Sequence, residues 1–219
     1  MDALDPLAVP VLFLGAGTWI AWLLAGTLVN RRRAAAVSRW LYAEARPYGA
    51  KLYIRWITLA AFELTVPEAR APFRHLSLTG FLESREMPFV WLWNRLRGRG
   101  DLLVVRAELR QQPRWGLEVY RANGLLAGDA RRAALAAGWT PVIGEDGREY
   151  ADGGAGAAAL RARALAALGA YAPHLERLAL QREAPQLLVT LAIGWLRPGT
   201  APPLGPHLVR LAEAIGADV

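Results

Sequence analysis

The longest apolar stretch of the chain comes first, at residues 7–29, and none of its 23 side chains is charged. A helix rises about 1.5 Å per residue, so this stretch would extend roughly 35 Å, more than the hydrocarbon core of a bilayer at about 30 Å. A helix also satisfies its own backbone hydrogen bonds and can therefore stand in lipid. The pattern predicts a transmembrane helix at residues 7–30, after a short external segment at residues 1–6.

The side chains that flank this stretch differ in charge. Three arginines follow it directly, Arg31, Arg32 and Arg33, whereas the charged residues that precede it are two aspartates. Basic residues next to a span stay on the cytoplasmic side. We therefore expect a single-pass protein of the cell membrane, with the N-terminus outside and residues 31–219 in the cytoplasm.

Two other interpretations of the stretch are weaker. A signal peptide carries its positive charge before the apolar run, and here the charge comes after it. A core helix of a soluble domain alternates polar and apolar faces, unlike this run. Within the run, small residues recur every four positions at Gly17, Ala21 and Ala25. Such a row lets a second helix approach closely, so we expect these residues to pack against a partner helix in the membrane.

After the first helix, which Pro47 and Gly49 end near residue 46, strand-like and helix-like patterns follow one another. Strands are expected at residues 51–66, 73–82, 101–110, 115–120, 175–182 and 186–195, with a short one at 142–143 in the otherwise irregular 139–150. Helices are expected at residues 87–97, 125–137, 155–171 and 207–215. Strict βαβ alternation is absent, which predicts an α+β fold: an N-terminal transmembrane helix and a mixed α/β cytoplasmic domain with a mainly antiparallel sheet. That domain covers residues 31–219, with two subdomains at 31–150 and 151–219 as an alternative.

Charge and composition say less about the fold than the hydrophobic pattern does, but they bear on the partners. The net charge is +7, from 26 basic and 19 acidic residues, and Lys51 is the single lysine. Arginine binds phosphate groups in a fixed fork, and a basic cytoplasmic domain is attracted to anionic lipid or to RNA. A GC-rich genome would explain the preference for arginine over lysine. The net positive charge is then the remaining indication of an anionic partner. The chain has no cysteine, which excludes disulfides, thiolate metal sites and thiol catalysis.

No set of residues in the sequence predicts an enzyme. The three histidines, His75, His174 and His207, are far apart, and no GxSxG or HExxH motif is present. The glycine-rich segment at residues 153–156 precedes a predicted helix, but it lacks the lysine of a phosphate-binding loop. Asp152 would repel a phosphate and is interpreted as a helix cap or loop residue. We expect no catalytic, cofactor-binding or metal-binding residues.

One short predicted helix combines aromatic and basic residues. Its candidates for contact with lipid or with a partner are Phe89, Trp91, Trp93, Arg95, Arg97 and Arg99. At a membrane interface, aromatic rings lie at the boundary and cations reach the lipid phosphates. The alternative is a helix packed on the sheet with a solvated last turn. The arginines would equally suit RNA phosphates, but no motif for reading bases is present, so DNA is not an expected partner.

The order of these features resembles the calumin family, the coiled-coil subunit of the eukaryotic PAT membrane-protein chaperone complex. The resemblance begins at the span with its basic end and the following helix around Trp40. It is closest at residues 81–109, FLESREMPFVWLWNRLRGRGDLLVVRAEL, where the family also has a short hydrophobic helix, arginine, an aspartate and a strand. It continues through GLEVYRANG, the helix with Tyr171, LERLALQREAP and the last predicted helix.

The resemblance implies a non-enzymatic, membrane-anchored factor that assists membrane-protein insertion or assembly near the Sec translocon. Membrane lipids and translocon or insertase components are the implied partners, with ribosome contact as a further option. The family's acidic segment is reduced here to MDALDP, and its C-terminal coiled coil is absent, so calcium binding and ribosome binding are not carried over. The alternative function is an accessory structural subunit of another membrane complex, docked through the small-residue row. An enzyme at the membrane surface ranks last.

Overall fold

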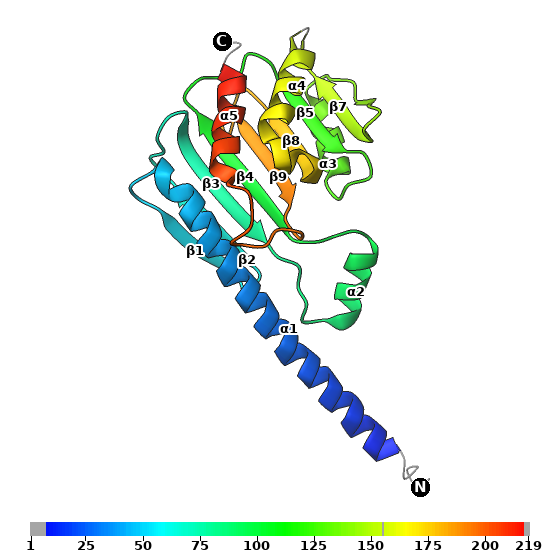
Figure 1. Ribbon diagram of the computed structural model, residues 1–219. Helices are drawn as coiled ribbons and strands as arrows, with labels where there is room; N and C mark the ends of the chain where they lie inside the picture. The colour runs from blue at the N-terminus through cyan, green and yellow to red at the C-terminus, as the bar shows by residue number, and fades with distance from the viewer. Residues whose placement is uncertain (1–7, 155, 217–219) are drawn as a thin grey trace.

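The structure is a computed structural model that describes residues 8–154 and 156–216. It consists of an α+β domain from which one long helix projects (Figure 1). This helix, α1 (Ala8–Ala45), is the one helix among the described residues that is long and apolar enough to cross a membrane. The predicted fold class is confirmed. The external segment predicted at residues 1–6 lies outside the described residues.

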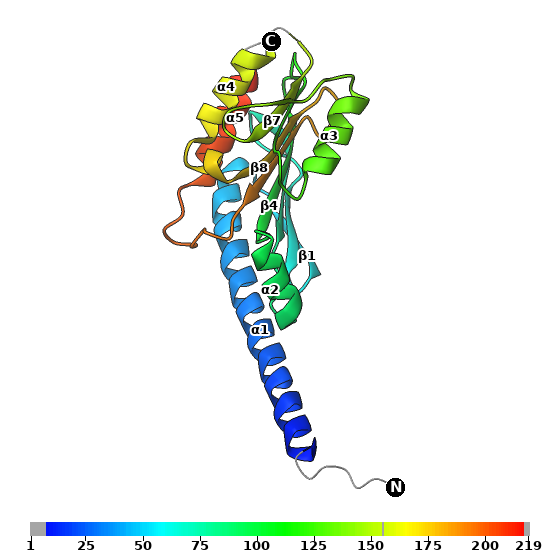
Figure 2. The ribbon, with the colours of Figure 1, turned by 90° about the vertical axis from the view of Figure 1, so that its right-hand side faces the viewer.

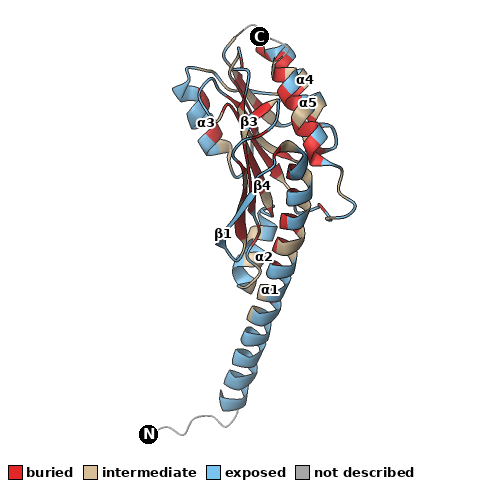
Figure 3. Ribbon diagram, turned by 90° about the vertical axis from the view of Figure 1, so that its left-hand side faces the viewer, coloured by how far each residue is buried: buried red, intermediate tan, exposed pale blue. Residues whose placement is uncertain are grey.

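Helix α1 has two different surroundings along its length. Each of residues 9–22 is exposed, as Figure 3 shows for the projecting part of the helix. Near the other end, Ala34, Val37, Leu41 and Ala45 are buried, and their spacing of three or four residues places them on one helical face. Pro47 lies in a short 3₁₀ helix, η1 (Arg46–Tyr48), directly after α1. The same helix therefore provides both the apolar projection and part of the domain core.

The nine strands found among the described residues belong to one antiparallel sheet, in the order β1-β2-β3-β4-β9-β8-β5-β7-β6. The strands are β1 (Tyr53–Thr58), β2 (Ala61–Val66), β3 (Phe73–Phe81), β4 (Leu102–Leu109), β5 (Leu117–Arg121), β6 (Val142–Ile143), β7 (Arg148–Asp152), β8 (Leu175–Leu180) and β9 (Leu187–Ala192). Strand β4 pairs with β9, which joins the early strands to the late ones. Residue 150 lies within β7, so residues 31–150 and 151–219 contribute to one shared sheet.

Helices cover both faces of this sheet. The end of α1 lies on one face together with α4 (Ala157–Leu168), the 3₁₀ helix η2 (Gly169–His174) and α5 (Leu204–Gly216). Helix α3 (Ala127–Ala136) lies on the opposite face (Figure 2). Alternate side chains of β2 and β4, among them Phe62, Leu64, Leu103 and Val105, are fully buried in the main core. The remaining helix, α2 (Pro88–Leu96), lies beyond the end of the sheet beside α1.

Three predictions for local structure are wrong. Residues 51–66 form two strands instead of one, because the chain reverses at Leu59 and Ala60 without the glycine, proline or asparagine that usually indicates a turn. The segment 139–150, predicted as loop apart from residues 142–143, contains most of β7, whose hydrogen bonds come from the distant β5. Asp152 ends β7 and is not a helix cap, since α4 begins after Gly156.

We expect Leu41→Ala to lower the free energy of unfolding by about 2–5 kcal/mol, because it leaves a cavity between α1 and the sheet. The Leu41 side chain is fully buried, whereas that of its neighbour Tyr42 is 44% exposed. Tyr42→Ala, the matched control, should change the free energy by less than about 0.5 kcal/mol. Urea unfolding in detergent, followed by tryptophan fluorescence, measures both. Equal losses for the two variants would show that α1 does not pack on the core in this register.

Candidate functional site

Helix α2 packs against the charge-free part of α1. The Trp22 side chain donates a hydrogen bond from Nε1 to the Arg85 carbonyl oxygen, at 3.0 Å. Ring centroids of Trp19 and Phe89 are 6.1 Å apart, and those of Trp22 and Trp91 are 6.0 Å apart. The aromatic side chains of α2 and of α1 therefore hold the two helices together, at the end of the domain from which α1 projects (Figure 1).

The close approach to α1 occurs at Gly26. A Cβ atom there would overlap the Arg85 carbonyl oxygen, so only glycine admits the backbone of the segment that leads into α2. Of the predicted small-residue row, Ala25 borders a hollow beside this contact, whereas Gly17 and Ala21 lie nearer the start of the helix. Gly17, Ala21 and Ala25 are all exposed, and nothing lies within 4 Å of a Cβ atom built at Gly17. Packing of that row against a partner helix stays a prediction.

A buried carboxylate joins this segment to α1. Asp101, at the start of β4, is only 1% exposed. Its Oδ2 accepts a hydrogen bond from Arg33 Nε at 3.1 Å, and its Oδ1 lies 3.4 Å from an Arg85 guanidinium nitrogen. The backbone N–H of Glu83 also donates to Oδ1, at 2.8 Å. A carboxylate removed from water needs such partners, and here it receives two guanidinium groups and one amide.

Arg33, predicted only to set the orientation of the membrane span, also makes hydrogen bonds inside the domain. Its two remaining guanidinium nitrogens donate to the carbonyl oxygens of Leu196, at 2.6 Å, and Ile193, at 2.9 Å. The Ile193 N–H in turn donates to the Asp101 carbonyl oxygen at 2.8 Å. Arg31 and Arg32 are exposed. The structure thus separates the three predicted arginines into two surface cations and one that joins α1 to the chain after β9.

Polar groups around Asp101 are not all paired. Asn30 is fully buried, and its Oδ1 accepts a hydrogen bond from an Arg85 guanidinium nitrogen at 3.0 Å. Burial raises the pKa of the Glu83 carboxyl above its usual range, Arg85 opposes the shift, and the Asp101 carboxylate adds to it. Glu83 Oε1, Asn30 Nδ2 and Trp91 Nε1 have no hydrogen-bond partner within the described chain. Glu83 therefore takes up a proton more readily than an exposed glutamate.

The structure divides the aromatic candidates for lipid or partner contact into residues that contact α1 and residues that stay exposed. The sequence alone did not separate them. Phe89 and Trp91 both contact aromatic rings of α1, although Phe89 remains 75% exposed. Trp93 forms the exposed apolar surface of α2 together with Val90, Leu92 and Leu96. No residue of α2 is buried, so the alternative of a helix packed on the sheet is wrong.

Two of the three arginines among the contact candidates, Arg95 and Arg97, lie above aromatic rings. The Arg95 guanidinium lies 5.9 Å from the Trp91 ring centroid, and that of Arg97 lies 4.2 Å from the Trp93 ring centroid. A guanidinium over an indole face is attracted by the ring quadrupole. Arg97 and Arg99 also border a hollow between the end of α2 and the loop after β5. The aromatic–arginine pattern thus has one apolar side and one cationic side.

The described residues offer no metal centre, since no group of three or more His, Asp or Glu side chains converges there. His174 stacks on Trp195, with ring centroids 4.2 Å apart, and burial lowers the pKa of its imidazole. His207 is buried and packs edge-on against Tyr171. Each of these two histidines thus has aromatic packing as its surroundings, and neither lies near a cluster of carboxylates.

Comparison with known proteins adds no assignment. No protein-family model matches the chain, and no curated protein matches it. The resemblance to the calumin family therefore stays a prediction that rests on the residues quoted for it. The function must be inferred from the arrangement of α1, α2 and the arginines.

We expect Gly26→Leu to destabilise the protein by about 1–3 kcal/mol, because the added side chain must push the Arg85 backbone away from α1. Gly17→Leu makes the same chemical change on an open face of the same helix and should leave stability unaltered. Thermal unfolding in detergent and limited proteolysis at residues 82–100 measure the two effects. Equal behaviour of both variants would contradict the observed approach of α2 to α1.

Proposed function

We propose that the protein is a membrane-anchored, non-enzymatic factor that assists the insertion or assembly of membrane proteins, with the N-terminus outside and the α+β domain in the cytoplasm. The observation that carries the proposal is that Phe89 and Trp91 hold α2 beside the charge-free part of α1. The other apolar side chains of α2 remain exposed, namely Val90, Leu92, Trp93 and Leu96. An exposed apolar helix at this place suits lipid or a hydrophobic segment of another protein.

The depth of α2 follows from its contacts with α1. Arg31 comes nine residues after Trp22, a separation of roughly 13 Å along a helix, and twelve residues after Trp19, roughly 18 Å. If Arg31 and Arg32 lie among the lipid headgroups, Trp22 lies within the same leaflet and Trp19 near the middle of the bilayer, with α2 beside them. Half of a hydrocarbon core is about 15 Å thick. Helix α2 would then enter the cytoplasmic leaflet next to the span.

A second apolar surface supports the same orientation. The turn between β1 and β2 exposes Trp56, Ile57 and Leu59, and these side chains line a groove of about 600 Å³ against Arg31 and Ala34 of α1. The groove thus begins directly beyond the span. Apolar side chains next to the basic end of a span are typical of a surface in contact with the lipid interface. The domain would rest on the membrane at this end.

The role in insertion or assembly follows the resemblance to the calumin family. A factor of this kind needs a surface within the leaflet that a client segment can reach, and the outward side of α2 would provide it. The alternative is an accessory structural subunit of another membrane complex. One observation favours it: the row of Gly17, Ala21 and Ala25 is uncovered and would admit a partner helix.

We expect α2 to be in contact with acyl chains. The chain has no cysteine, so Leu92→Cys gives a single site for a fluorophore, with Leu135→Cys on α3 as a matched exposed control. In nanodiscs, lipids brominated on the acyl chain should quench the label at residue 92 strongly and the label at residue 135 hardly at all. Equal quenching at the two sites, or none at residue 92, would contradict placement of α2 in the leaflet.

The role itself is tested by photo-crosslinking in cells from residue 96 on α2 and from residue 21 in the small-residue row. Capture of a translocon or insertase component from residue 96 is the expected result. Capture of a respiratory or transport complex from residue 21 alone would support the structural subunit instead. Crosslinks to lipid only, from both positions, would contradict both roles.

A further inference from the structure

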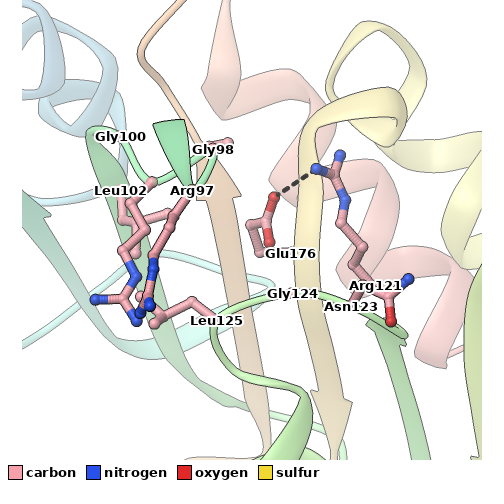
Figure 4. Close-up of a pocket in the computed structure, with 11 residues that line it drawn as sticks. Arg97, Gly98, Gly100, Leu102, Arg121, Asn123, Gly124, Leu125 and Glu176 are labelled. Atoms are coloured by element: carbon pink, nitrogen blue, oxygen red, sulfur yellow. Dashed lines mark ion pairs between the residues drawn. The ribbon is translucent and has the colours of Figure 1, made fainter. Parts of the chain in front are cut away.

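A hollow of about 500 Å³ lies between the loop after α2 and the loop after β5. We refer to it as the α2–β4 hollow. Figure 4 shows Arg97 and Leu125 on one side of it and Arg121 with Glu176 on the other. Arg99 also lines it. Segments far apart in the sequence thus contribute three arginines to the lining of one cavity.

Two of these three charges are uncompensated. Arg121 forms an ion pair with Glu176, at 3.4 Å, which neutralises it in part. Within residues 8–154 and 156–216, no carboxylate lies within ion-pairing distance of Arg97 or Arg99. The α2–β4 hollow therefore carries a net charge of about two positive units, and guanidinium groups bind phosphate oxygens through paired N–H donors.

The loop that carries these arginines is held in shape before any ligand arrives. The Arg97 guanidinium lies over the Trp93 ring. The Arg99 N–H donates to the Asn94 carbonyl oxygen at 2.9 Å, and Gly98 between them has φ of +67°, a conformation that favours glycine. A fixed loop loses less conformational entropy when it binds an anion.

The α2–β4 hollow lies at the level expected for lipid headgroups. Gly100, which lines it, directly precedes Asp101, and Asp101 binds Arg33 at the basic end of the apolar part of α1. The outward apolar side of α2 comes directly before the loop in the chain. A phospholipid could therefore place its phosphate in the hollow and its acyl chains against Leu92 and Leu96.

We propose that the α2–β4 hollow binds the phosphate of an anionic phospholipid, with Arg97 and Arg99 as its main ligands and Arg121 as a third. This inference rests on the proposed position of α2 in the cytoplasmic leaflet. Phosphate is the recognised chemistry, and the lipid is its favoured source because the apolar surface of α2 adjoins the cationic loop. A nucleic acid would gain nothing from that apolar surface.

The test uses the full-length chain in nanodiscs of phosphatidylcholine with increasing fractions of phosphatidylglycerol. A fluorophore on Leu125→Cys, at the edge of the hollow, reports binding. We expect Arg97→Gln and Arg99→Gln each to weaken the response to phosphatidylglycerol about tenfold, the loss of one charge-assisted hydrogen-bonding group. Arg132→Gln on α3 removes the same charge from an exposed site and should leave the response unchanged.

Further measurements distinguish an anionic phospholipid from free phosphate and from RNA as the ligand. Arg97→Lys keeps the charge and should retain part of the response, and unchanged thermal unfolding of all variants shows that they are folded. Competition by inorganic phosphate at concentrations equal to those of the lipid would overturn the assignment to lipid. The assignment would also be overturned if Arg97→Gln and Arg99→Gln lost binding to an RNA oligonucleotide while their binding to phosphatidylglycerol stayed intact.

Failure of this inference is distinguishable from failure of the proposed function. An equal response of Arg97→Gln, Arg99→Gln and Arg132→Gln, with the label at residue 92 still quenched by brominated lipid, would overturn the phosphate site alone. Absence of quenching at residue 92 would overturn the position of α2, whatever the arginine variants do.

Discussion

The ion pair between Arg33 and Asp101 fixes how the long helix meets the folded domain. Asp101 is buried at the start of β4, and Arg33 lies where the apolar part of α1 enters the domain. A buried carboxylate is stable only when charges and donors surround it, and Arg33, Arg85 and the Glu83 amide do so. Because Arg33 also binds the carbonyl oxygens after β9, α1 is attached to the ends of two neighbouring strands in the middle of the sheet, β4 and β9. The orientation of any membrane span is thereby transmitted to the whole domain.

The position of α2 depends on the same contacts. Arg85 binds Asp101 through its side chain and accepts the Trp22 hydrogen bond through its carbonyl oxygen, so one residue links the buried carboxylate to the apolar helix. Gly26 provides the space for that backbone to approach. Helix α2 then has no place on the sheet, and its apolar side chains remain outward. The proposed contact with lipid and the proposed phosphate site both follow from this placement.

The sequence predicted what local pattern controls. The uncharged run, the alternating strand residues and Pro88 at the start of α2 are local signals, and the α+β fold followed from them. The pairing of β7 with β5, and the reversal at Leu59, depend on partners elsewhere in the sheet, so periodicity could not reveal them. The charge of Arg33 and the small size of Gly26 are visible in the sequence. Their roles are not, because Arg33 binds Asp101 and Gly26 admits the Arg85 backbone, and each of these partners is more than fifty residues away. Arg121 was missed because only the fold brings it near Arg97.

The most direct measurement of the central ion pair is the distance between spin labels placed on α1 and α2, at Leu24→Cys and Leu96→Cys, in a chain without other cysteines. With Asp101 intact, the distance distribution should be narrow. Asp101→Asn removes the charge that holds Arg33 and Arg85, so the distribution should broaden and thermal stability should fall. Asp129→Asn, at an exposed ion pair on α3, should change neither. A distribution that stays narrow in Asp101→Asn, with unchanged stability, would contradict the account.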